Sequence, residues 1–476
     1  MDMFKKKSLC AALAGIGALG VAGAAQAVNV NGDGLGQVLI YPYYTARNDG
    51  AGNAYNSLLT VVNTTNSAKS VKVRFLEGKN SREVLDFNLF LSKHDVWTAA
   101  VGASSGGGAA VFSSDASCIL PNQLPSGGQA FVNFAYSGSN DDGAGTSLDR
   151  TMEGYVEIIE MATYASTSTT SINVTHVNGV PPGCAKETDA QAATDALAPS
   201  GGLLGTMSLI NVDSGNGYSY NATALDNYST NNLYAASGLP QPDLTEAFPP
   251  ISVVNAENAT FQSTWGLGSA DPVSAVLMHD NVMNEYVLDA STTSGTDWVV
   301  TMPTKRFYVP VAAKATPANN APFQRNFTAT GSCDDVSLSI YDREERTTST
   351  PLNFSPPPPT STNSICWEAN VITFNNSNVL GSTNVANIPV GFQDGWLDLG
   401  WTPNSSATAA HQLVNFNTSV TPLGGTPTAS TVTYVGVPVV GFAAESFVNN
   451  GIVVGGSTVL SAYGNTYPHR YTTTIN

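Results

Sequence analysis

The chain has 476 residues and a formal net charge of −17, from 19 basic and 36 acidic side chains. Nucleic acids and anionic membrane surfaces bind basic surfaces, so this charge argues against both as partners. Hydrophobic residues make up 42% of the chain, which is enough for a sizeable core and argues against wholesale disorder. Only 12% of the residues are charged, as is common in extracellular β proteins with surfaces rich in Ser, Thr, Asn and Gly.

Residues 1–27 have the pattern of a cleavable secretory signal peptide. A lysine-rich start is followed by the apolar residues 9–23 and by a small-x-small cleavage site at residues 25–27. We expect the mature chain to begin near Val28 and to be exported to the cell surface, the extracellular space or the periplasm. Later apolar runs are shorter than the ~20 residues of a membrane-spanning helix, so the sequence predicts no transmembrane span.

The start of the mature chain contains a calcium-loop pattern. Asn29, Asn31 and Asp33 supply oxygen atoms at the first, third and fifth positions of such a loop, and a glycine follows. The twelfth position, which should carry a bidentate carboxylate, is the apolar Ile40. We therefore favour a flexible polar segment and keep calcium as the alternative.

Residues 56–101 show the strongest local pattern. Val71 and Val73 alternate with Lys72 and Arg74, and turn-rich segments separate several such period-2 runs. Short strands at this spacing predict an antiparallel β-sandwich. The tract resembles an immunoglobulin or fibronectin-III-like module of bacterial surface proteins, so we place an Ig-like sandwich domain at residues 28–170.

Candidate catalytic motifs are weak. Residues 102–106 read G-x-S-x-G, but more glycines follow where a nucleophile elbow needs a helix. The five histidines are far apart in the sequence, and the charge cluster at residues 342–346 reads as an exposed, salt-bridged turn. We predict no catalytic residue.

Four cysteines follow the signal peptide, and an even number in an exported chain favours two disulfides. Four cysteines allow three pairings. We favour Cys118 with Cys184 and Cys333 with Cys366, the pairing given by nearest-neighbour closure. A zinc site is disfavoured because the sequence has no C-x-x-C motif or Cys/His cluster.

A second calcium candidate is the run Asn140, Asp141 and Asp142 in a glycine-rich segment. Carboxylate and amide oxygens are the ligands that Ca²⁺ prefers. A solvated hairpin turn explains the same residues and is the reading we favour.

Residues 171–310 read as a mixed, mainly β region with short helices. The alanine-rich residues 187–198 form one helix candidate. Residues 271–280 form the clearest one, with Asp271 as the expected N-cap and Pro272 in the first turn.

Residues 311–476 return to β composition and are predicted to form a C-terminal β domain. Residues 432–442 and 452–463 read as its closing strands. A proline run at residues 356–359 lies between two of the cysteines and is interpreted as a stiff loop tied at its base.

Trp396 and Trp401 flank a four-residue segment of this region. Exposed tryptophans stack on sugar rings, so the pair is a candidate glycan contact. Tryptophans in the core of a sandwich are the more frequent case, and the odd spacing argues against one shared strand face.

Three segments, residues 63–75, 298–305 and 441–443, are similar to pieces of uncharacterised secreted surface proteins of Gram-negative bacteria. The resemblance implies export and a surface location, and it carries no activity.

We therefore expect a mainly β protein built from antiparallel sandwiches with one or two short helices. The predicted function is that of an exported structural or interaction protein, in a matrix, filament, surface layer or adhesion system, acting without catalysis. The predicted partners are the chain itself, other surface proteins or glycans; no cofactor is predicted, with calcium as the alternative. A carbohydrate-binding protein or secreted glycan-active hydrolase is the second hypothesis, and it predicts a cleft lined by Trp396 or Trp401 with two facing carboxylates.

Overall fold

The structure is a computed structural model that describes residues 26–49, 52, 54–311, 320–347, 363–401 and 410–476. Nearly all of the predicted signal peptide and the proline run at residues 356–359 lie outside the described residues. Within these ranges, none of the helices has the length and apolar character needed to cross a membrane.

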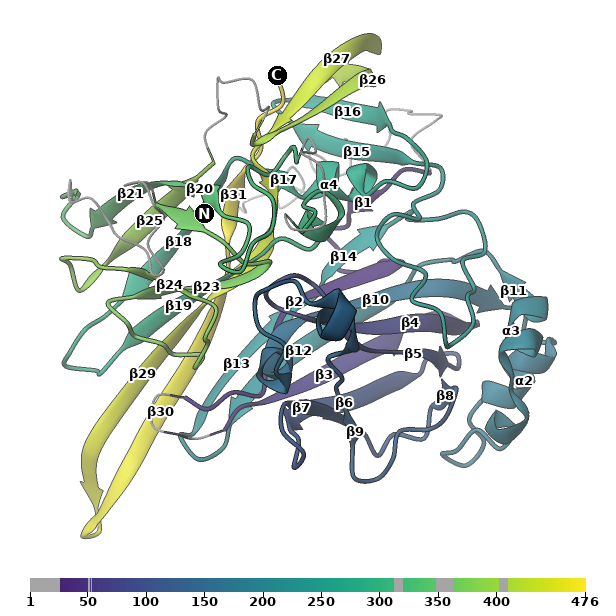
Figure 1. Cartoon of the computed structure of the whole chain (residues 1–476), viewed down its shortest axis with the longest axis horizontal. Helices are drawn as coiled ribbons and strands as arrows, with labels where there is room; N and C mark the ends of the chain where they lie inside the picture. The colour runs from purple at the N-terminus through teal and green to yellow at the C-terminus, as the bar shows by residue number, and fades with distance from the viewer. Residues whose placement is uncertain (1–25, 50–51, 53, 312–319, 348–362, 402–409) are drawn as a thin grey trace, which may run out of the picture.

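Two antiparallel sheets form a sandwich in the first half of the chain (Figure 1). The eight-stranded sheet contains, in spatial order, β1 (Asn29–Val30), β14 (Thr223–Asp226), β2 (Val38–Thr45), β10 (Glu153–Tyr164), β4 (Ala68–Glu77), β5 (Glu83–Leu91) and β8 (Cys118–Leu120), with β11 (Ala196–Leu197) paired to β10. The six-stranded sheet contains β13 (Asn216–Asn221), β12 (Leu203–Asn211), β3 (Asn56–Asn63), β6 (Val96–Ala103), β7 (Ala109–Phe112) and β9 (Gln129–Ala130). The predicted fold class, mainly β with antiparallel sandwich packing, is confirmed.

The predicted alternation in β4 sets the two faces of the eight-stranded sheet. Val71 and Val73 enter the core between the sheets. Lys72 and Arg74 lie on the opposite face, yet they too are buried. Ion pairs satisfy them there: Lys72 Nζ lies 3.0 Å from a carboxylate oxygen of Asp86, and Arg74 forms ion pairs with carboxylates of β5 and β10.

Three further sheets of four or five strands lie in the rest of the described chain. The five-stranded sheet contains β24 (Val385–Ile388), β23 (Ala369–Phe374), β19 (Gly295–Thr301), β29 (Val440–Val454) and β30 (Ser457–Pro468). The β21–β31 sheet contains β21 (Ser337–Asp342), β25 (Asp394–Gly400), β18 (Asn281–Val287) and β31 (Arg470–Thr472). The β15–β27 sheet contains β15 (Ile251–Ala256), β16 (Ala259–Thr264), β26 (Gln412–Pro422) and β27 (Thr428–Val435). Two short pairs complete the described strands: β17 (Met278–His279) with β28 (Val437–Pro438), and β20 (Asp334–Asp335) with β22 (Ser364–Ile365).

The five-stranded sheet is a layer shared by two cores. On one face, Val299 and Phe442 belong to the same buried cluster as the interior of the first sandwich. On the other face, Trp298 and Val300 pack in a second cluster with residues of the β21–β31 sheet such as Leu397. The two halves of the chain are therefore joined by continuous apolar packing.

Strand pairing runs across both predicted domain boundaries, at residues 170/171 and 310/311. In the first sandwich, Met207 of β12 pairs with Leu59 of β3. Trp298 of β19 pairs with Ile372 of β23 on the far side of residue 310. Each sheet is thus assembled from segments that are distant in the sequence.

Three short α-helices occur in the described chain: α2 (Thr169–Val174), α3 (Asp189–Asp195) and α4 (Asp271–Leu277). The two predicted helices are α3 and α4, both shorter than expected. Ala270 is the N-cap of α4, so the expected cap Asp271 lies inside the first turn, beside Pro272. Five 3₁₀ turns accompany the helices: η1 (Phe134–Tyr136), η2 (Gly138–Asn140), η3 (Leu148–Met152), η4 (Cys184–Lys186) and η5 (Lys305–Phe307).

The prediction of a single strand over residues 452–463 is wrong. A two-residue turn at Gly455 and Gly456 divides this segment between β29 and β30. Both glycines have positive φ, 62° and 86°, as a tight hairpin turn with the twist of its strands requires. The result is a long hairpin in place of a closing strand.

Candidate interaction surfaces

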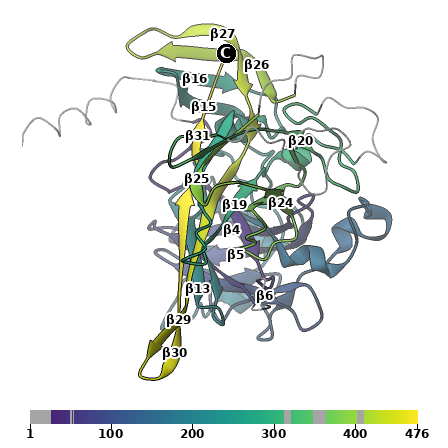
Figure 2. The ribbon, with the colours of Figure 1, turned by 90° about the vertical axis from the view of Figure 1, so that its left-hand side faces the viewer.

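The outer part of the β29–β30 hairpin projects from the body of the protein (Figures 1 and 2). β29 pairs with β19 as far as Ser446, and beyond that residue its paired strand in the described chain is β30. Val448 N still donates to Thr292 O at 2.9 Å, so the free part begins after this contact. We call residues 449–461 the arm.

The arm and its base lack charged side chains. Residues 446–468 contain no Asp, Glu, Lys or Arg, in a chain with a net charge of −17. Val454 and Tyr463 are 61% and 63% exposed. An isolated two-stranded ribbon is marginally stable in water, and an apolar ribbon with open edges is a template for pairing with another chain.

Two disulfides hold loops to the sheets, and both have the predicted pairing. Cys118 of β8 is joined to Cys184 of η4, and Cys333 is joined to Cys366. The first bridge ties the segment containing α2 and α3 to the edge of the eight-stranded sheet.

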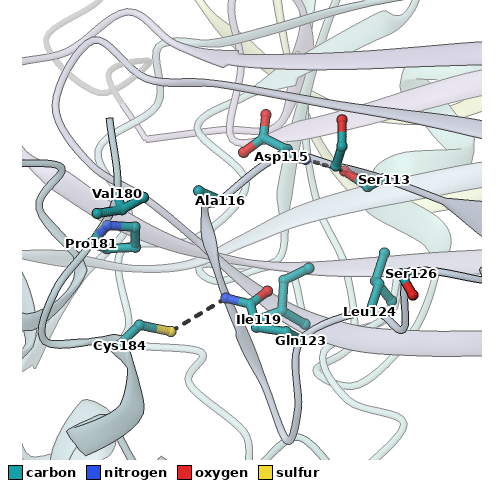
Figure 3. Close-up of a pocket in the computed structure, with 11 residues that line it drawn as sticks. Ser113, Asp115, Ala116, Ile119, Gln123, Leu124, Ser126, Val180, Pro181 and Cys184 are labelled. Atoms are coloured by element: carbon teal, nitrogen blue, oxygen red, sulfur yellow. Dashed lines mark hydrogen bonds between the residues drawn. The ribbon is translucent and has the colours of Figure 1, made fainter. Parts of the chain in front are cut away.

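A hollow of about 420 Å³ lies beside the first disulfide (Figure 3). Gln123 Nε2 lies 3.4 Å from Cys184 Sγ at one side. Asp115, the only charged residue that lines it, accepts hydrogen bonds from Ser117 and from the backbone N of Thr98. Because this carboxylate is already bonded within the chain, the hollow offers little chemistry for a ligand.

The first calcium candidate forms a closed turn. Asn31 Oδ1 accepts from Asp33 N at 3.0 Å, and Asn31 Nδ2 donates to Leu35 O at 2.7 Å. Asn29 lies in β1, and its Oδ1 accepts from Asn227 Nδ2. The amide oxygens of the two asparagines are therefore used in bonds within the chain, and calcium binding here stays a prediction.

The second calcium candidate is divided between the surface and the interior. Asn140 Nδ2 donates to Phe134 O, and Asp141 Oδ1 accepts from Gly143 N. Asp142 is buried, and its two oxygens accept from Arg150 at 2.8 and 3.0 Å. Burial alone would raise the pKa of Asp142, but the hydrogen bonds from Arg150 and Asn80 lower it overall. Among the described residues, no group of three or more His, Cys, Asp or Glu side chains is arranged to hold a metal ion.

The structure separates the two candidate glycan-binding tryptophans. Trp401 is 1% exposed and belongs to the second core, which agrees with the favoured core interpretation and removes it as a candidate glycan contact. Trp396 is 41% exposed, and its ring stacks on Tyr341 of the neighbouring strand with 4.6 Å between ring centroids and 14° between planes. The five-residue separation places the two tryptophans on different sides of the β21–β31 sheet.

Carboxyl groups flank the Tyr341–Trp396 stack. Glu285 lies opposite Trp396 in the β18–β25 pair, and Asp394 is two residues from Trp396 on the same face of β25. Glu445 of β29 is buried, and its Oε1 has no hydrogen-bond partner in the described chain. Burial, together with the charges of Glu285 and Asp394, raises the pKa of Glu445 to about 7. A carboxyl group with such a pKa can exchange a proton near neutral pH.

The charge cluster at residues 342–346 is a salt-bridged turn, as predicted. Arg346 Nε lies 2.5 Å from Asp342 Oδ2, and Arg343 Nη1 lies 3.2 Å from Asp394 Oδ2. Glu344 joins both arginines. These carboxylates are therefore used in ion pairs within the chain.

Sequence reasoning missed the arm, although its signal was present. Gly455 and Gly456 follow the apolar residues 452–454 and precede Ser457 and Thr458, and a Gly-Gly pair between two β-forming runs is a common signature of a two-residue hairpin. It also missed an arginine-lined hollow between β4–β5 and η5, because its residues come from four separate segments of the chain. Comparison of this chain with protein-family models, with curated proteins and with solved structures finds no match.

Proposed function

We propose that the chain is an exported structural protein of the cell surface or extracellular space, which associates with further copies of itself through the arm and acts without catalysis. The observation that carries this proposal is the projection of an uncharged, two-stranded ribbon beyond the packed sheets. Such a ribbon gains stability when its open edges or its apolar side chains meet another surface.

A second copy is the partner that the charge distribution favours. Two chains of net charge −17 repel each other, so a self-contact must form where charge is absent. The uncharged residues 446–468 meet this condition. Strands β15 and β27 are the outer strands of the β15–β27 sheet, and each edge is partly covered: Val28 bonds to β15, and residues 474–476 bond to the end of β27. The remaining parts of these edges offer backbone groups to which an arm can add as a further strand.

The signal-peptide pattern and the two disulfides support export. Disulfides persist in oxidising compartments and are rare in the cytosol. These features and the sequence resemblance to secreted surface proteins support a location at the cell surface or outside the cell.

Single cysteines report whether the arm is covered in an assembly. All four cysteines of the predicted mature chain are in disulfides, so Val454→Cys would introduce one reactive thiol at the tip of the arm. The matched control is Phe134→Cys, at a residue 73% exposed in η1, away from the arm and from the β15–β27 sheet. We expect thiol labelling at position 454, but not at 134, to slow by at least about tenfold as the protein is concentrated. Equal labelling of both variants at all concentrations would contradict the proposal.

Glycan binding is the second candidate, because the Tyr341–Trp396 stack is exposed on a sheet face beside carboxylates. Flat aromatic surfaces pack against the apolar faces of sugar rings, while carboxylates accept hydrogen bonds from hydroxyl groups. Affinity electrophoresis in gels containing soluble polysaccharides tests it. Retardation that is lost in Trp396→Ala but kept in Phe416→Ala, an exposed aromatic residue elsewhere, would support this candidate; equal mobility with and without polysaccharide would remove it.

The hydrolase form of this candidate needs two carboxyl groups that reach the substrate, and Glu445, whose pKa is raised to about 7, is only 2% exposed and would have to become accessible. It predicts release of reducing ends from a polysaccharide that the protein binds, and loss of that release in Glu445→Gln. Binding of the polysaccharide without release of reducing ends would support a carbohydrate-binding protein rather than a hydrolase.

A further inference from the structure

A hollow of about 450 Å³ lies at the junction of the two halves of the chain. One side is formed by the turn between β4 and β5, which contains Ser81 and Arg82. The other sides come from the segment around Asp243 and from η5 with the residues that follow it, including Arg306 and Phe307. None of these residues belongs to the arm or to the Tyr341–Trp396 stack.

Three guanidinium groups line this hollow, in a chain with only 19 basic side chains. Arg74 is neutralised, because its Nε lies 2.8 Å from Glu83 and its Nη1 lies 2.7 Å from Glu157. The other two, Arg82 and Arg306, do not form short ion pairs of this kind.

Arg82 has the least satisfied guanidinium group of the three. Its Nε is buried without a hydrogen-bond partner, and no side-chain hydrogen bond or ion pair of its guanidinium is found among the described residues. A buried N–H that has lost its water and found no acceptor carries the full cost of desolvation. Arg82 lines the hollow, so an acceptor that reached this N–H from the hollow would remove that cost.

Arg306 is only partly satisfied. Its Nη1 donates to Ser81 O at 3.3 Å, which places this guanidinium beside the residue that precedes Arg82. Its Nη2 lies 3.7 Å from Asp243 Oδ2, an ion-pair distance too long for a hydrogen bond, and its Nε is buried without an acceptor in the described chain. Both arginines line the hollow, and each has donors without an acceptor in the described chain.

Three carboxylates, those of Glu83, Glu157 and Asp243, lie beside the three guanidinium groups, so the hollow would attract an anion through its unmet donors rather than through an excess of positive charge. Glu83 is paired with Arg74, and Asp243 Oδ1 accepts from Thr245 N and Oγ1 at 2.9 and 2.6 Å. Glu368, behind Ser81, is buried, and burial raises its pKa to about 8, so it is mostly neutral at pH 7.

An apolar wall faces these donors. Phe307, Val309 and Pro310 line the same hollow, and the Arg306 guanidinium carbon lies 4.4 Å from the centroid of the Phe307 ring. Space of this size, with donors on one side and apolar groups on the other, suits a small molecule with a charged end and an apolar body.

We propose that this hollow binds a small organic anion, whose carboxylate or sulfate group lies between Arg82 and Arg306 and whose apolar body packs on Phe307 and Val309. Guanidinium groups bind planar and tetrahedral oxyanions through charge-assisted hydrogen bonds, often two at a time. The site is independent of the proposed self-association, because its residues are remote from the arm in the sequence and in the sheets.

Isothermal titration calorimetry of the mature chain at low ionic strength tests the site with four probes: benzoate, phenyl sulfate, inorganic sulfate and neutral benzyl alcohol. We expect saturable binding of at least one aromatic anion, weaker binding of inorganic sulfate and none of benzyl alcohol. Benzoate and phenyl sulfate distinguish a carboxylate site from a sulfate site. Absence of saturable binding by both aromatic anions, or equal affinity for benzyl alcohol, would overturn the proposal.

Matched arginine variants locate the binding. Arg82→Gln and Arg306→Gln should each lower the affinity by at least about tenfold, because each removes a charge-assisted contact. Arg470→Gln, at an exposed arginine of β31, should leave the affinity unchanged. Arg82→Gln should fold normally, as judged by an unchanged or higher Tm, because its guanidinium makes no bond in the described chain. Unchanged affinity in both Arg82→Gln and Arg306→Gln would overturn this assignment.

Discussion

Ser81 and Glu368 lie 287 residues apart in the chain, and their side chains are joined by a direct hydrogen bond in the interior. The Ser81 hydroxyl donates to Glu368 Oε2 and also accepts from Tyr155 Oη at 2.8 Å. Ser81 has a φ of 48°, a conformation that side chains other than glycine rarely adopt. The bond connects the β4–β5 turn of the first sandwich to the segment before β23, and so joins the two halves of the molecule.

Glu368→Gln should change stability in a pH-dependent manner. The pKa of Glu368 is raised from 4.5 to about 8, chiefly by burial, so the folded protein holds a proton that the unfolded chain releases. The wild type therefore loses stability as pH rises from 4.5 to 8, by on the order of 4 to 5 kcal/mol, and the neutral glutamine does not. Urea unfolding at several pH values should show that the free energy of unfolding of the variant increases relative to that of the wild type as pH rises across this range. A difference that does not vary with pH would contradict a protonated Glu368.

His469→Gln should flatten the stability profile at low pH. Burial lowers the pKa of His469 from 6.5 to about 4, against the opposing hydrogen bond to Val299 O. Between pH 6.5 and about pH 4, His469 is protonated in the unfolded chain but neutral in the folded protein. The free energy of unfolding therefore decreases as pH falls through this range. The contribution lost is roughly 3 kcal/mol. Parallel urea titrations of both proteins should diverge between pH 6.5 and 4; parallel curves throughout would show that His469 does not titrate as described.

The two tryptophans form a matched pair for a stability test. Trp401→Ala should lower the free energy of unfolding by about 3 to 5 kcal/mol, because it empties a buried site in the second core. Trp396→Ala removes a side chain that is 41% exposed and should cost less than about 1 kcal/mol. Similar losses in the two variants would mean that Trp396 is buried in solution, which would also remove it as a glycan contact.

Removal of either disulfide should lower stability by about 4 kcal/mol on the chain-entropy model, because the bridges close loops of 66 and 33 residues. The Cys118→Ser/Cys184→Ser variant and the Cys333→Ser/Cys366→Ser variant test this by urea unfolding. Stability equal to that of the wild type in either double variant would show that its bridge contributes nothing in solution.

Local patterns predicted the parts of the fold that depend on neighbouring residues. Alternation in residues 56–101 gives strands with the expected faces, and Pro272 marks the start of a real helix. The disulfide pairing followed from chain proximity. These features are decided by interactions over a few residues or by short loop closure, so the sequence contains their signals.

Long-range pairing could not be predicted in the same way. β12 returns to pair with β3, and nothing in either strand specifies its partner. Lys72 and Arg74 show why charge is an unreliable guide to exposure, since ion pairs from other strands bury both. Of the candidate binding residues, Trp396 is exposed whereas Trp401 is in the core, and only tertiary packing decides between them.

Val448 and Ala462 pair across the hairpin at the base of the arm, which allows a clean truncation. Replacing residues 449–461 by Asn-Gly joins these two positions with a tight turn and leaves the five-stranded sheet intact. Light scattering behind a size-exclusion column, on the mature chain and on this variant between about 1 and 100 µM, measures the self-association directly. We predict assemblies that grow with concentration for the intact chain and a monomer for the truncated one. An intact chain that stays monomeric, or a truncated chain that assembles equally well, would contradict the proposed function.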